Sequence, residues 1–291
     1  MAYATAIAIE SLEDIARIAV TGYPPQAWYR GHGDTNWALK PGVHRDEFPN
    51  PLQEHMLAQT FRSRATPVMK SGPAIQEQLE WLYVMQHYGV PTRLLDWTRS
   101  PLIGVYFAVR DSAQDERDGC LWLLLPSKMN EAMGGSGALL GSGDRVLQRI
   151  TYNAYSMPTK RQAATMAHLA ISSMHRDNRQ MLQQSEFTIH DTRDAIEDHE
   201  DGESFLIKHD VPRRSKRRLR SELRALGMTR HGLFPDLANI AISITEDVRN
   251  PSAGIDQEFL EEKRAEWRVS DVLRNLKRKA QSKEGEEGSS S

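Results

Sequence analysis

The chain has 291 residues, 39% of them hydrophobic and 26% charged, and its formal net charge is −2. This composition is typical of a soluble globular protein, and the charge balance gives no argument for general binding to nucleic acid. The single cysteine, Cys120, excludes a disulfide within the chain. We expect a cytoplasmic protein with no membrane partner, because we find no signal peptide and no apolar run near the roughly 20 residues that cross a bilayer.

The first third of the chain predicts helices and short strands in alternation. A short extended segment over 4–9 precedes a helix that Ser11 caps. Residues 26–31 are rich in aromatic side chains and predict a strand. Helices are expected over 52–64 and 74–88, and the second of these has the most regular apolar spacing in the chain.

The strands that follow define the expected fold. A strand over 92–97 ends in a polar turn, and Pro101 begins the next helix, where its missing N–H costs nothing. Residues 119–125 are apolar, which indicates a strand inside a sheet. Further strands are expected over 186–190, where apolar and polar residues alternate, and over 204–209. Because regular strand–helix alternation is missing, we predict an α+β fold with a mixed sheet flanked by helices.

The second half of the chain also carries predicted helices and a strongly basic segment. One or two helices are expected over 159–182. Residues 213–220 are basic and open a further helix, with a face that is either solvated or suited to phosphate groups. We divide the chain into one domain over 1–249 and a charged, helical and disordered tail over 250–291.

Polar side chains crowd around the strand and turn that precede Pro101. They are Gln86, His87, Thr92, Arg93, Asp96, Thr98, Arg99 and Ser100. A buried polar group without a partner costs roughly 1–3 kcal/mol, so these groups either satisfy one another in the core or converge on a ligand. The start of the following helix is also suited to an anion, since its first N–H groups point outward. We interpret the cluster as a whole as a binding site.

Arg30 lies at the end of the aromatic strand, directly before Gly31. A guanidinium group can make two parallel hydrogen bonds to a phosphate or carboxylate, and a glycine lets a ligand or another backbone approach closely. The alternative is a structural ion pair of Arg30 with Asp34 or Asp96. Glu186, at the start of a later strand, is likewise either a surface carboxylate or a catalytic one.

Four segments together resemble the FRG domain family, which is named for an aromatic-Arg-Gly motif. They are Tyr29-Arg30-Gly31, Gln86-His87-Tyr88-Gly89 with 91–98, Ser100-Pro101 with Tyr106-Phe107-Ala108, and Leu233-Phe234-Pro235-Asp236-Leu237. The resemblance covers roughly residues 8–245 and identifies 1–249 as an FRG domain. It implies a bacterial or phage-associated protein, with a defence system as one setting.

A weaker resemblance links the chain to ADP-ribosyltransferases of the Arg-Ser-Glu class. Tyr29-Arg30-Gly31 matches their early strand, Thr98 and Ser100 resemble their polar strand end, and Glu186 stands where they carry a glutamate before a later strand. The Ser-Thr-Ser and Glu-x-Glu patterns are missing. This resemblance implies NAD as the substrate of an ADP-ribosyltransferase-like enzyme or an NAD glycohydrolase.

The resemblance also implies roles for individual residues. Cleavage of the nicotinamide–ribose bond passes through an oxocarbenium-like state, as in glycoside hydrolysis. Arg30 would hold the pyrophosphate and Glu186 would stabilise the positive charge, so these two are the expected catalytic residues. The expected ligand-binding residues are Arg30, Gln86, His87, Thr92, Arg93, Asp96, Thr98 and Ser100, and Glu222 is the next carboxylate to consider.

These assignments make a geometric expectation. Arg30, Asp96, Thr98 and Glu186 should surround one pocket, because polar residues beside apolar strands need shared partners or a shared ligand. The competing function is a non-enzymatic module that binds nucleic acid or protein through 213–220. In that module Arg30 and Asp96 would form a buried ion pair.

Overall fold

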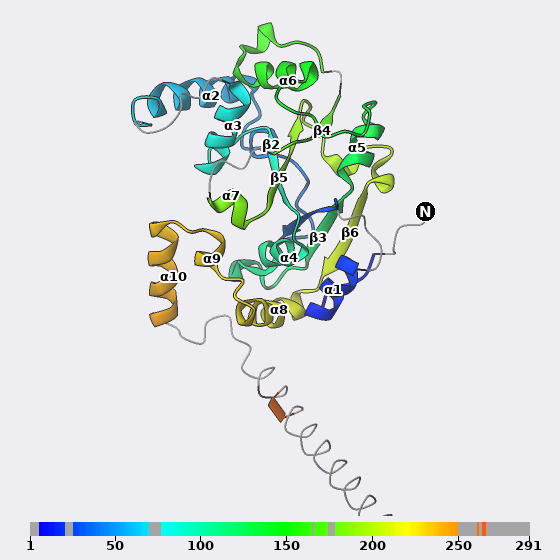
Figure 1. Ribbon diagram of the computed structural model, residues 1–291, viewed down its shortest axis with the longest axis vertical. Coiled ribbons are helices and arrows are strands. Elements are labelled where there is room, and N and C mark those ends of the chain that lie inside the picture. Colours follow the sequence, from blue (N-terminus) through cyan, green and yellow to red (C-terminus); the bar gives the residue numbers. More distant parts are fainter. Residues whose placement is uncertain are drawn as a thin grey trace, which may run out of the picture.

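The computed structural model of the chain describes residues 6–20, 26–69, 77–164, 166–173 and 178–249, together with 261, 264 and 265. Within these residues, six strands form one sheet with helices packed around it (Figure 1). The expected α+β class is therefore confirmed. The expected charged, helical and disordered tail over 250–291 lies almost wholly outside the described residues.

The strands run antiparallel throughout the sheet, where a mixed arrangement was expected. Their order across the sheet is β4-β5-β2-β1-β3-β6, and each neighbouring pair is antiparallel. β3 lies between β1 and β6 and is buried along its whole length, as its apolar sequence predicted. The strands are β1 (Trp28–His32), β2 (Leu94–Thr98), β3 (Gly119–Leu124), β4 (His168–Ile171), β5 (Ser185–His190) and β6 (Leu206–Val211).

The sheet is weakly joined at its centre, between β1 and β2. Within the described residues, Tyr29 and Thr98 are the one pair that these two strands share. By contrast, β1 is paired with β3 over all its residues, and β2 is paired in the same way with β5. The half-sheets β4-β5-β2 and β1-β3-β6 therefore diverge on either side of this pair.

The helices cover the sheet and one another. α4 packs on β1 and β3, α3 packs on β2, and α8 packs on α4 (Figure 1). Local signals start several helices: Ser100 caps α4, and Asn50 and Gln53 form a capping box at α2. The helices are α1 (Leu12–Val20), α2 (Pro51–Ala65), α3 (Gln78–His87), α4 (Pro101–Val109), α5 (Pro126–Ala132), α6 (Arg145–Tyr155), α7 (Asn178–Leu182), α8 (Arg213–Ala225), α9 (Arg230–Leu233) and α10 (Leu237–Arg249).

Three sequence predictions differ from the structure. The region 159–182, expected to be helical, contains the buried edge strand β4 as well as the short helix α7. Pairing with β5 decides the conformation there, because it buries every residue of β4. Residues 6–9 of the expected first strand form no strand, and the rest of it lies outside the described residues. Helices α5 and α6 were not predicted.

Gly31 marks the closest approach between the sheet and α4. A Cβ atom at Gly31 would lie 1.9 Å from the main-chain oxygen of Gly104 and 2.6 Å from the main-chain nitrogen of Ala108. The glycine after Arg30 therefore admits a neighbouring backbone, one of the two explanations that the sequence left open.

We predict that Gly31→Ala lowers the free energy of unfolding by about 1–3 kcal/mol or more, because α4 must move away from β1. Gly33→Ala is the matched control, since a Cβ atom there meets side-chain atoms, the nearest being Gln114 Cγ at 3.1 Å. Urea unfolding measures both variants. Equal losses in the two variants would contradict this account of Gly31.

Three histidines are packed together in the core. The ring of His190 lies 4.6 Å from that of His168 and 6.4 Å from that of His44, between centroids. Burial lowers the pKa of His44 to about 3 and that of His168 to about 4, and it also lowers the pKa of His190. These three side chains are therefore neutral in the native protein at neutral pH.

We predict that the protein loses stability as the pH falls from about 6.5 to about 4. The native pKa values lie below the ordinary value of 6.5, so in this range the unfolded chain binds protons that the native protein does not. Each histidine adds up to about 1.4 kcal/mol of destabilisation per pH unit. Urea unfolding between pH 7 and pH 4.5 measures the slope. His168→Gln should reduce that slope, and an unchanged slope would contradict the prediction.

Candidate functional site

A cavity of about 860 Å³ opens where β1 and β2 diverge. Residues from both strands line it, together with residues of the 33–47 segment, the C-terminal end of α4, and α7. Phe234, which follows α9, completes the wall. The cavity is large enough for a nucleotide-sized ligand.

Four of the residues singled out in the sequence line this cavity: Arg30, Gln86, Asp96 and Thr98. Hydrogen bonds connect three of them. Gln86 Nε2 donates to Asp96 Oδ2 at 2.7 Å, and Arg30 Nη1 donates to the main-chain oxygen of Asp96 at 2.6 Å. The strand register pairs Thr98 with Tyr29, so Arg30 points to the opposite side of β1. Both side chains nevertheless reach the cavity, because the sheet is open there.

Arg30 connects the two diverging strands. Its Nε donates to His32 Nε2 at 3.0 Å, while its Nη1 bonds to β2. Burial lowers the pKa of Arg30 to about 10 and that of His32 to about 3. At neutral pH Arg30 is therefore charged and His32 is a neutral acceptor. The ion pair between Arg30 and Asp96 that we considered is replaced by a hydrogen bond to a main-chain oxygen.

Asp96 is the exposed residue of β2, and Gln86 donates a hydrogen bond to its Oδ2 atom. Thr92 donates to Gln86 Oε1 at 2.6 Å, which turns the amide nitrogen of Gln86 toward Asp96. Thr92 also accepts from the main-chain nitrogen of Leu94 at 3.0 Å. Thr92 thus positions Gln86 and does not itself line the cavity.

Two other expected ligand-binding residues lie outside the cavity. His87 ends α3, and its main-chain oxygen accepts from Arg179 Nη1 at 3.2 Å. Ser100 Oγ accepts from the main-chain nitrogen of Ile103 at 3.4 Å and so begins α4. These contacts assign His87 and Ser100 local structural roles.

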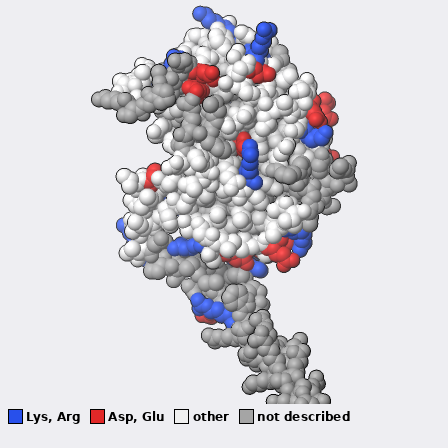
Figure 2. All heavy atoms as spheres, viewed as in Figure 1, with Lys and Arg blue, Asp and Glu red and all other residues white. Residues whose placement is uncertain are grey.

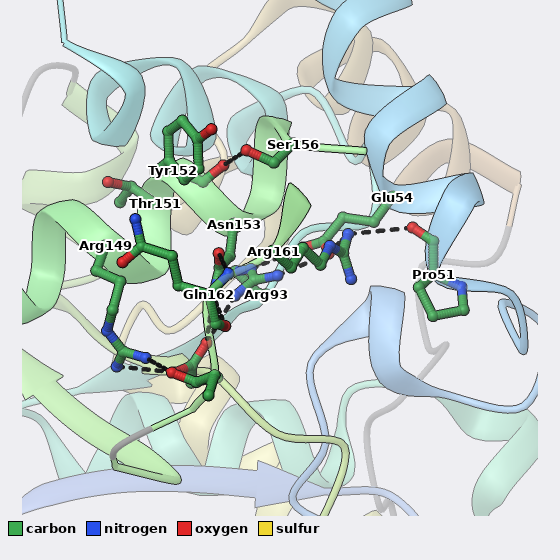
Figure 3. A network of polar contacts seen from close by, with 12 residues as sticks. Pro51, Glu54, Arg93, Arg149, Thr151, Tyr152, Asn153, Ser156, Arg161 and Gln162 are labelled. Atoms are coloured by element: carbon green, nitrogen blue, oxygen red, sulfur yellow. Dashed lines mark hydrogen bonds and ion pairs between the residues drawn. The ribbon is translucent and has the colours of Figure 1, made fainter. Parts of the chain in front are cut away.

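Arg93 lies in a buried ion network instead of the cavity (Figure 3). Its Nε and Nη2 each donate to one carboxylate oxygen of Glu54 at 2.7 Å, and its Nη1 lies 3.5 Å from Asp191 Oδ1. Arg161 shares Glu54, and Arg149 shares Asp191. The network joins the residue directly before β2 to α2 and α6, so Arg93 stabilises the packing of these elements.

Glu186 also lies outside the cavity lining. It is buried on β5, where it pairs with Arg99 and accepts from Ser173 Oγ at 2.7 Å. Its neighbour Ser185 lines the cavity, opposite Thr98 in the register. The side chain of Glu186 is instead held by these contacts with Arg99 and Ser173. The second candidate, Glu222, accepts from Leu12 and Arg218 and is likewise not among the lining residues.

The sequence did not indicate several cations that line the cavity: Lys40, Arg45, Arg110 and Arg179. Within the described residues, neither these four nor Arg30 forms an ion pair with a carboxylate. Elsewhere the fold pairs many of its arginines with acidic side chains: Arg93, Arg99, Arg117, Arg149, Arg161, Arg214, Arg218 and Arg220. Carboxylates also line the cavity, namely Asp46, Glu47, Asp96 and Asp111, but in the described part of the chain none of them forms a close ion pair with these cations.

The basic segment 213–220 is largely occupied by contacts within the chain. Lys216 is buried, and its Nζ donates to the main-chain oxygens of Gly33 and Gln114 at 2.6 Å. Arg214, Arg218 and Arg220 form ion pairs with Glu10, Glu222 and Asp115. Figure 2 shows Lys and Arg on the face in view as separate small groups, several beside Asp or Glu.

We predict that Arg93→Met lowers the free energy of unfolding by about 3–5 kcal/mol, because it leaves the carboxylates of Glu54 and Asp191 buried without their central partner. Arg45→Met is the control, since Arg45 is exposed and forms no ion pair within the described residues. Chemical unfolding at pH 7 compares the two. A stable Arg93→Met protein that loses only ligand binding would contradict the structural role.

Comparison with known proteins gives one family match. Residues 25–117 match the model of the FRG domain. No curated protein and no solved structure matches the chain, and a likeness to ADP-ribosyltransferases is not shown. In the described part of the chain, no helix is long and apolar enough to cross a membrane. The matched segment contains Arg30, Gln86, Asp96 and Thr98, and the chain is thus an FRG domain-containing protein.

Proposed function

We propose that the cavity binds a nucleotide and that NAD is its substrate. The observation that carries this proposal is the group of cations around the cavity that lack a carboxylate partner. Charged groups removed from water are stabilised by opposite charge, and guanidinium groups match phosphate oxygens well. A nucleotide supplies that charge.

The aromatic side chains of the cavity support the same ligand class. Trp37 lines the cavity and is 47% exposed, which leaves its ring free to stack on a base. Phe107 and Phe234 also line the cavity. Flat apolar surfaces beside cations fit a ligand that carries both planar rings and phosphates.

Asp96 is the carboxylate that β2 presents to the cavity, and in this proposal it takes the catalytic role first considered for Glu186. The bond between nicotinamide nitrogen and ribose C1′ breaks, and nicotinamide leaves with the electron pair. An oxygen of water or of another acceptor bonds to C1′, and its proton passes to bulk water. Asp96 stabilises the positive charge that develops on the ribose.

We predict that the protein binds NAD in isothermal titration calorimetry and that Arg30→Gln weakens this binding about tenfold or more, through the loss of a charged group in the cavity wall. Arg217→Gln is the matched control: it removes the same charge from an exposed position on α8, outside the cavity lining. Wild-type protein that does not bind NAD would contradict the proposal.

We predict further that the protein cleaves labelled NAD and that Asp96→Asn lowers the rate of cleavage about a hundredfold or more. Glu186→Gln protein that folds should cleave NAD at the wild-type rate. The reverse result would assign the reaction to Glu186. If NAD binds and is never cleaved, the enzymatic part is wrong. In that case the non-enzymatic alternative gains support from salt-dependent binding to nucleic acid that Arg217→Gln weakens.

A further inference from the structure

Two arginines at one side of the cavity share a single aromatic ring. Cζ of Arg179 lies 4.7 Å from the ring centroid of Phe234, and Cζ of Arg110 lies 5.6 Å from the same centroid. Arg110 also lies 4.9 Å from the ring centroid of Phe107. All four residues line the cavity. Guanidinium groups over aromatic rings keep the N–H donors at their edges available to a ligand.

Like charges lie close together in this arrangement. Burial lowers the pKa of Arg110 and the positive charges of Arg230 and Arg179 add to that effect, while Tyr106 and Asp111 act in the opposite direction. Within the described residues, neither Arg110 nor Arg179 forms an ion pair with a carboxylate. Like charges held near one ring repel each other, and a phosphate group between them would turn this repulsion into attraction.

Hydrogen bonds to the main chain hold Arg179 and the segment before Phe234 in place without a ligand. Arg179 Nη1 donates to the main-chain oxygen of His87 at 3.2 Å. Gln183 Nε2 donates to the main-chain oxygen of Leu233 at 2.8 Å, which fixes the chain just before Phe234. The main-chain oxygen of Gln183 in turn accepts from Thr98 Oγ1 at 2.7 Å.

The turn between α7 and β5 is strained at the residue that follows Gln183. Gln184 has a φ of +46°, in the left-handed region that residues other than glycine seldom adopt. The turn brings both Gln183 and Ser185 to the cavity wall. Strain of this kind is often stored at binding sites, where the surrounding structure holds it.

We infer that Arg110 and Arg179 form a pyrophosphate subsite of the cavity. Both guanidinium groups contact the ring of Phe234, a residue far from them in the sequence. This inference rests on the proposed function, in which the whole ligand is NAD. It adds that Arg110 and Arg179 bind the pyrophosphate group of that ligand. It also changes the role of Arg30, because Arg30 already donates to His32 and to the main chain of Asp96. Arg30 therefore connects two residues of the cavity wall, His32 and Asp96. The phosphates bind at the side of the cavity that Arg110 and Arg179 line.

Sodium pyrophosphate is the probe that tests the subsite by isothermal titration calorimetry. Wild-type protein should bind it, and Arg110→Gln and Arg179→Gln should each weaken binding about tenfold or more. Arg217→Gln should bind as wild type does, and added NaCl should weaken binding. Absence of binding to the wild type, or wild-type affinity in both cavity variants, would overturn the inference.

A second measurement separates binding from folding. Without an anion, Arg110→Gln should melt at the wild-type temperature or above it, because the substitution removes repulsion. Added pyrophosphate should raise the melting temperature of the wild type more than that of Arg110→Gln. A lower melting temperature for Arg110→Gln, with equal gains from pyrophosphate, would assign Arg110 a structural role and overturn the subsite.

The outcomes for NAD distinguish this inference from the proposed function. If NAD binds wild type and Arg110→Gln equally, the subsite is wrong and the proposed function stands. If pyrophosphate binds in an Arg110-dependent way and NAD does not bind, the subsite stands and the assignment of NAD is wrong.

Discussion

The pairing of β1 with β2 at Tyr29 and Thr98 is the constraint on which the site depends. A sheet that is continuous across these strands would have filled the space that the cavity occupies. Divergence leaves main-chain groups of both strands without strand partners, and buried groups of this kind need other bonds. Arg30 supplies one, because it donates to the main-chain oxygen of Asp96 from the neighbouring strand. The opening and the arginine that spans it therefore belong to one arrangement.

The distribution of charge separates the structural arginines from those of the cavity. Arg93 has its charge and its planar geometry matched by Glu54, and the buried network around it forms part of the core. Arg110 and Arg179 have aromatic rings as neighbours instead, and Arg179 also donates to the main-chain oxygen of His87. Arginine thus serves both in buried ion pairs and in the cavity wall. The sequence alone does not distinguish these two roles, because it does not show which arginines lie beside a carboxylate after folding.

The sequence predicted the local elements of the site better than the contacts between distant segments. Arg30, Asp96 and Thr98 follow from strand ends and polar crowding, and they do meet at one cavity. Glu186 is not among the lining residues, because it is buried in an ion pair with Arg99, whereas its neighbour Ser185 lines the cavity. Phe234 belongs to a segment that carries the family resemblance, but nothing in the sequence linked it to Arg179, since that contact is made only after folding. The strand β4 was missed for the same reason.

The extent of the family match has a consequence for work with fragments. Residues 25–117 contain β1 and β2, whereas the strands that flank this pair, β3 and β5, lie beyond residue 117. A polypeptide cut to these limits would retain two strands joined at one residue pair, with both outer edges bare. Exposed strand edges invite association with other chains. The segment that matches the family model therefore lacks the strands that pair with β1 and β2, and recombinant fragments should extend past residue 117 to include them.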